Sequence, residues 1–159
     1  MEPAAIIVIS EIGIPKFGSV PLEAALLICA TNGEVIYRNF WKIRAPIQIG
    51  NLEKSQRDAL YYCLSTYGGD WITDESIPPI GYVMGEIAET ISNFEIGNIF
   101  TKGTIQEKQL RGLMSRHDIA TDVTDVSHIV KLKETGLTGG LDDWVWSHRP
   151  HIPYLNLME

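Results

Sequence analysis

Two continuous apolar runs near the start of the chain most restrict the folds it can adopt. Residues 6–9 and 24–30 consist entirely of Ile, Val, Leu, Ala and Cys, without the polar alternation of a half-exposed strand. Such β-rich runs are typical of strands that are buried on both faces of a sheet. We therefore expect the first of these strands at residues 5–10 and the second at residues 24–30.

A turn signal joins the second run to a third strand. Asn32-Gly33 separates residues 24–30 from residues 35–43, and both turn residues tolerate a positive φ. The third segment alternates less regularly, so it is expected to be the more exposed strand. The chain is therefore predicted to open with three antiparallel strands.

Helix and strand patterns alternate downstream of this meander. Helices are expected at 52–64, 82–94, 104–114 and 127–134, and short strands at 98–101 and 123–125. Thr104 and Glu107 have the spacing of a capping box for the third of these helices. The connections are long enough for parallel crossover units. The pattern predicts an α/β fold whose central mixed sheet has about five strands, three antiparallel and then parallel, flanked by helices.

Length and composition limit the number of domains and the compartment. With 159 residues, of which 45% are hydrophobic, the chain is expected to form one globular domain over 1–159. No apolar run approaches the ~20 residues of a membrane span, and the N-terminus lacks a basic signal segment. Two cysteines, Cys29 and Cys63, are too few for a disulfide framework. We expect an intracellular protein, cytoplasmic or nuclear, without membrane association.

The charge balance bears on the class of partner. Thirteen basic residues against twenty acidic ones give a net charge of −7. Nucleic-acid binding depends on Lys and Arg that neutralise phosphates, so this balance argues against a strong, non-specific binder of DNA or RNA. An acidic enzyme can still act on nucleic acid where metal ions bridge its carboxylates to the phosphate.

The end of the first strand, Ile9-Ser10-Glu11-Ile12-Gly13, resembles the first motif of the DEDD (DnaQ-like) 3′–5′ exonucleases of the RNase H-like superfamily. In that family an Asp and a Glu two residues later hold catalytic metal. Glu11 and Gly13 match the motif, but Ile9 stands in the Asp position. The stretch Pro21-Leu22-Glu23-Ala24-Ala25 is similar to the start of the family's second strand. The resemblance implies an RNase H-like fold.

Two later motifs of the family are matched in spacing but not in chemistry. The Asp that opens a helix after the fourth strand falls on Gln106. The last motif, His-x-x-x-x-Asp, is matched by His151 followed by Asn156. The resemblance implies that Glu11 and His151 are remnants of a catalytic site. The loss of the acidic tetrad is also similar to that of the Maelstrom domain, a degenerate relative.

These substitutions decide what chemistry the resemblance allows. Cleavage with two metals needs two divalent ions about 4 Å apart, and Mg²⁺ is usually held by carboxylates. Ile9 cannot ligate a metal, and Gln106 and Asn156 offer only neutral oxygens. We therefore expect no metal or other cofactor, with Glu11 the ligand if one binds, and interpret the chain as an inactive exonuclease-fold domain that binds protein or nucleic acid. The alternative is an active, divergent exonuclease that uses Mg²⁺ or Mn²⁺, with His151 as general base.

Other residues could in principle restore a metal site. A shifted acid such as Glu107 or Asp143 is one possibility, although acids at strand and helix ends commonly serve as caps. Zinc held by His148, His151 and Cys63 is another, but a structural zinc site needs four ligands. Prolines beside the two histidines argue against the helical geometry such a site would use.

The C-terminal segment is the expected binding element. Trp144 and Trp146 are followed by Arg149, and aromatic residues and Arg are the usual anchors of protein interfaces. Stacking on nucleic-acid bases is the alternative, weakened by the few basic residues around them. We expect a protein partner or self-association through this segment, and at most weak binding of nucleic acid.

Overall fold

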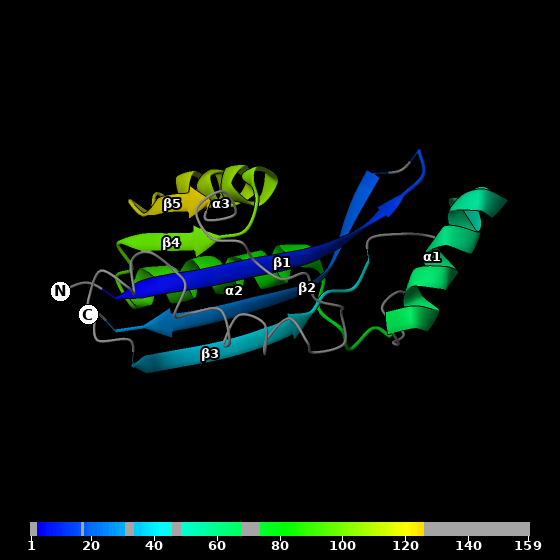
Figure 1. The fold of residues 1–159 in the computed structure, drawn as a ribbon. Coiled ribbons are helices and arrows are strands. Elements are labelled where there is room, and N and C mark those ends of the chain that lie inside the picture. Colours follow the sequence, from blue (N-terminus) through cyan, green and yellow to red (C-terminus); the bar gives the residue numbers. More distant parts are fainter. Residues whose placement is uncertain (1–2, 17, 31–33, 46–48, 68–73, 126–159) are drawn as a thin grey trace.

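The computed structural model describes residues 3–16, 18–30, 34–45, 49–67 and 74–125. Over these ranges the chain forms a five-stranded mixed sheet with three α-helices (Figure 1). The strands are β1 (Ala4–Ile14), β2 (Gly18–Cys29), β3 (Val35–Lys42), β4 (Asn98–Thr101) and β5 (Asp122–Asp125). The helices are α1 (Lys54–Tyr67), α2 (Ile80–Asn93) and α3 (Thr104–Arg116), with a short 3₁₀ turn η1 (Ile49–Asn51) before α1.

The strand order confirms the expected fold class. Across the sheet the order is β3-β2-β1-β4-β5. The first three strands are antiparallel, whereas β4 and β5 run parallel to β1. None of the helices within the described ranges has the length and apolar character needed to cross a bilayer.

β1 and β2 form the centre of the sheet because their apolar runs are buried on both faces, as predicted. All residues of 4–9 and 22–29 are buried. Alternate side chains enter two different apolar clusters. Ile7 and Ile9 share one cluster with α2 and α3, whereas Ile6 and Val8 belong to the cluster on the opposite face.

Helices α2 and α3 cover one face of the sheet. Their buried side chains recur at helical spacing and join the cluster that contains Ile7 and Ile9; these are Val83, Ile87, Ala88 and Ile91 of α2 and Leu110, Leu113 and Met114 of α3. Burying one such large aliphatic side chain contributes roughly 1.5–3 kcal/mol to folding. This packing fixes α3 beside the end of β1.

The first two strands are longer than their sequence patterns predict. They continue as a hairpin to Ile14 and Gly18, past a bulge at which Ser10 pairs with Glu23 but Glu11 pairs with Pro21. Polar residues interrupt the apolar pattern here, so burial alone gives no sign of the continuing strand pairing. Figure 1 shows α1 at the far end of this hairpin.

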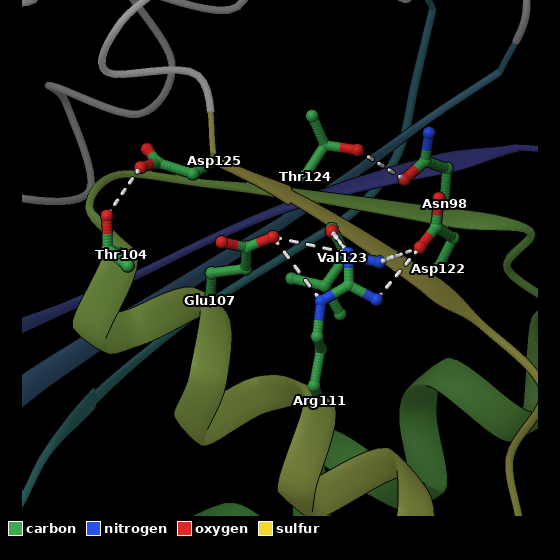
Figure 2. Close-up of polar contacts among 8 residues, drawn as sticks. All are labelled: Asn98, Thr104, Glu107, Arg111, Asp122, Val123, Thr124 and Asp125. Carbon is green, nitrogen blue, oxygen red and sulfur yellow. Dashed lines mark hydrogen bonds and ion pairs between the residues drawn. The ribbon is translucent and has the colours of Figure 1, made fainter.

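The N-terminus of α3 is capped from β5 instead of by the predicted capping box. Gly103 precedes the helix with a φ of 101°. The Asp125 carboxylate accepts hydrogen bonds from the Gly103 N–H (2.8 Å) and the Thr104 hydroxyl (3.4 Å; Figure 2). Glu107 is paired with Arg111 at 3.2 Å. The capping-box prediction was wrong because the acceptor comes from a strand that lies next to the helix only after folding.

Removing this cap should destabilise the domain. Asp125 is only 8% exposed, and the variant Asp125→Ala leaves the Gly103 N–H without this acceptor. We expect the free energy of unfolding, measured by urea denaturation, to fall by about 1–2 kcal/mol. The control is Asp122→Ala, which removes a solvent-exposed ion pair with Arg111 and should cost much less. Equal losses in the two variants would contradict the capping role.

Candidate functional site

β1 extends beyond its neighbour β4, and the part from Ile7 to Ile14, which β4 does not pair with, is called the end of β1. β4 pairs with β1 only from Ala4 to Ile6. Beyond Ile6, side chains instead of a neighbouring strand form hydrogen bonds with the main chain of β1. The Thr101 hydroxyl donates a hydrogen bond to the Ile7 carbonyl at 2.7 Å, and Gln106 from the first turn of α3 reaches Ile9.

The Gln106 side chain reproduces the hydrogen bonding of a strand. Its Nε2 donates to the Ile9 carbonyl at 2.6 Å, and its Oε1 accepts from the Ile9 N–H at 3.0 Å. The Thr101 hydroxyl lies 3.2 Å from the same Oε1. The amide is therefore engaged on both sides, and it ties α3 to β1 across 97 residues of chain.

Two of the three substituted motif positions are thus in direct contact. The Ile9 side chain is 1% exposed and belongs to the core beneath α2 and α3. Glu11 lies two residues further along β1 and is partly exposed. It accepts a hydrogen bond from Gln109 Nε2 at 3.3 Å.

Several sequence-based predictions concern residues outside the described ranges. They are the remnant and substituted positions His151 and Asn156, the proposed interaction residues Trp144, Trp146 and Arg149, and the acid Asp143. The proposed zinc ligands His148 and Cys63 are not described either, the latter in its side chain. These predictions therefore stay predictions.

The side chains at the end of β1 do not offer the metal-ligand atoms needed for the pair of divalent ions that the sequence resemblance implies. Ile9 has no ligand atom, the Gln106 amide oxygen already accepts from a main-chain N–H, and Glu11 supplies a single carboxylate. Each hard cation needs several oxygen ligands with compensating charge. Within the described ranges, no three His, Cys, Asp or Glu side chains form a group that could hold a metal ion.

The acids of α3 and β5 have structural partners. Glu107 is bound by Arg111, which also contacts the Asp122 carboxylate at 3.0 Å and the Val123 carbonyl (Figure 2). The hydrogen bond to Glu107 raises the pKa of the Arg111 guanidinium above its usual value. Arg111 thus joins α3 to β5, and Glu107 holds its guanidinium from one turn earlier in the same helix. Together with the Asp125 cap, this agrees with the interpretation of these acids as structural.

The sequence analysis did not predict that an acid would be buried in β2. Glu23 of β2 is fully buried and stands in register with Ser10 of β1 and Lys42 of β3. Side chains alternate along a strand, so Glu23 belongs to the face opposite Ile9 and Glu11. It therefore does not add a carboxylate to the site at the end of β1.

A groove of about 370 Å³ opens beside Glu11. Its floor is apolar and is formed by Ile9, Pro21, Ile80 and Met84 from β1, β2 and α2. One wall is α3.

The α3 wall carries the groove's positive charge. Lys108, Gly112 and Arg116 recur every four residues, so they lie along one stripe of the helix. Sequence reasoning missed this wall because it followed the acids of the family motifs. The four-residue spacing was the signal that could have revealed it.

No protein-family model and no curated protein sequence matches this chain. Solved structures do match it. Exonuclease I (apo) superimposes with a TM-score of 0.53 and 9% identity, over 81% of this chain and 30% of that chain. The fold is exonuclease-like. The ExoI/SSB-Ct complex gives 0.52 and 10% identity, over 81% and 29%.

A third structure, E. coli Exonuclease I in complex with a dT13 oligonucleotide, gives a TM-score of 0.52 and 9% identity over 79% of this chain and 28% of that chain. The chain thus spans less than a third of the length of these exonucleases. Identities of this size establish the fold alone, and a shared fold does not carry function with it. The function has to be argued from the residues at the end of β1.

Proposed function

We propose that this domain is a catalytically inactive relative of the exonucleases, a pseudonuclease, that acts as a binding module. The observation that carries the proposal is the pair of hydrogen bonds between Gln106 and the main chain of Ile9. Two positions at which the resemblance places metal-binding carboxylates serve here to fill the core and to join α3 to β1. Both roles are structural, and neither leaves a free ligand atom.

The remaining features support the same proposal. Glu11 is the one carboxylate retained at a matching position, and its partner is the neutral amide of Gln109. The net charge of −7 disfavours tight binding of a polyanion without metal. We propose a protein partner, or self-association, as the main ligand, with Trp144, Trp146 and Arg149 as an interaction segment.

The domain is expected to show no metal-dependent nuclease activity. The full chain is incubated with end-labelled single-stranded DNA and RNA in Mg²⁺ and, separately, in Mn²⁺, and the products are resolved on denaturing gels. Cleavage should not exceed that of the Glu11→Ala variant, because one carboxylate cannot hold two cations. Thermal melting should likewise be unmoved by either ion, since a ligand stabilises only the state it binds.

The same assay can overturn the proposal. Cleavage above the level of Glu11→Ala that also disappears in His151→Ala would establish the divergent exonuclease instead. In that case Mn²⁺ should raise the melting temperature of the unmodified chain but not that of Glu11→Ala.

A further inference from the structure

The groove beside Glu11 combines an aliphatic floor with a basic wall. Pro21, Ile80 and Met84, which are partly exposed, supply apolar surface at its base. Ile105, at the start of the α3 wall, is 68% exposed although it is a large apolar residue. The groove's volume of about 370 Å³ falls in the range of roughly 300–1,000 Å³ that is usual for ligand pockets. The groove therefore offers an apolar side chain a place to be buried.

The cations of the wall are available to a ligand. Lys108 and Arg116 are exposed, and neither forms a salt bridge among the described residues. Gly112 lies between them, and Arg116 Nη1 is 3.3 Å from the position that a Cβ on Gly112 would take. The missing side chain thus lets the guanidinium lie along the helix surface at the groove. Two unpaired cations at one groove contrast with the acidic balance of the whole chain.

We propose that this groove binds an extended acidic peptide segment of a protein partner, with an apolar side chain seated on the floor and neighbouring carboxylates paired with Lys108 and Arg116. The inference rests on the proposed role as a non-catalytic binding module and names the chemistry of its ligand. Arginine and carboxylate form strong charge-assisted hydrogen bonds. Charge complementarity of this kind selects the partner and speeds its association.

The lining favours a peptide over a nucleic acid. Single-stranded nucleic acid is held by tracks of cations and by aromatic side chains on which bases stack. Among the described lining residues there are two cations, one carboxylate and no aromatic ring. Glu11 would repel a phosphate backbone, whereas a peptide can place its carboxylates at the α3 wall and leave Glu11 with Gln109.

The experiment is a selection of phage-displayed random peptides on the full chain, followed by fluorescence anisotropy of the enriched peptides as labelled synthetic probes. Enriched sequences should combine apolar residues with Asp or Glu. Their dissociation constants should rise by about tenfold or more in Lys108→Glu, because one attraction becomes a repulsion. Gly112→Leu, which fills the groove from the same stripe, should weaken them similarly.

Matched variants separate the groove from general effects. Lys54→Glu changes the same charge on α1, and Gly81→Leu places the same side chain at an exposed glycine of α2 with open space around it. Both should bind the peptides as the unmodified chain does. No enrichment, enrichment of basic peptides, or equal losses in Lys54→Glu and Lys108→Glu would overturn the inference.

Three further outcomes distinguish a failure of the groove inference from a failure of the proposed function. An oligothymidylate that binds through Lys108 and competes with the peptides would overturn the peptide assignment in favour of nucleic acid. A failed selection together with absent nuclease activity would remove only the groove inference. Groove-dependent peptide binding together with metal-dependent cleavage would remove only the pseudonuclease proposal.

Discussion

Replacing Ile9 by aspartate is expected to destabilise the domain strongly instead of creating a metal site. Ile9 is 1% exposed and packs in the cluster beneath α2 and α3. The variant removes a buried aliphatic side chain and places an unpaired carboxylate in the same space. These two effects should lower the free energy of unfolding by about 4 kcal/mol or more, a large share of the ~5–15 kcal/mol of a typical domain.

The measurement is urea denaturation followed by circular dichroism, with and without Mg²⁺. Ile9→Val, which removes one methylene, should cost only about 1 kcal/mol. Ile9→Asn has a similar shape to the aspartate without its charge, so the difference between the two variants isolates the buried charge. A stable Ile9→Asp variant whose melting temperature rises with Mg²⁺ would contradict this prediction, because the new carboxylate would then lie in a metal site instead of in the core.

The parts of the fold that depend on burial were predictable from the sequence. The run at residues 6–9 has no polar position. A half-exposed strand would alternate, whereas a strand covered on both faces buries every side chain, as this one does. The apolar period of residues 82–94 predicted α2, which is found at Ile80–Asn93. Both signals are local, because each comes from the spacing of residues within one element.

The parts that depend on contacts between distant segments were not predictable. Continued pairing of β1 to Ile14 depends on β2, and the cap of α3 comes from Asp125. The family resemblance named Ile9 and Gln106 only as substituted motif positions and did not predict the contact between them. That contact, an amide bonded to the main chain of β1 beyond its pairing with β4, follows from the short pairing of β4, which no motif encodes.

Gln106→Glu tests this link most sharply, because it changes one amide into a carboxyl group of nearly the same shape. At neutral pH the carboxylate can still accept from the Ile9 N–H. It cannot donate to the Ile9 carbonyl, which lies 2.6 Å from the atom that Gln106 uses as a donor. The variant should lose about 2–3 kcal/mol of unfolding free energy near pH 7, since a hydrogen bond becomes a repulsive contact.

Protonation of the new carboxyl should recover most of this loss. Its O–H then donates to the Ile9 carbonyl, so folding favours the protonated form and raises its pKa above the unfolded value of about 4.3. A raised folded-state pKa gives stability that is fully present below the unfolded pKa and is lost as the pH rises through the folded pKa. The gap between Gln106→Glu and the unmodified chain should therefore be small near pH 4 and should widen toward pH 7.

Gln106→Ala is the control, because it loses both hydrogen bonds and has no group to titrate. It should be destabilised relative to the unmodified chain by a similar amount at both pH values. Denaturation curves of the three proteins at the two pH values give the comparison directly. If Gln106→Glu were as stable as the unmodified chain at neutral pH and further stabilised by Mn²⁺, the new carboxylate would be turned toward a metal shared with Glu11. The Gln106 amide would then be a replaceable remnant of a metal site, whereas a pH-dependent loss without a metal effect makes it the connection that holds α3 to β1.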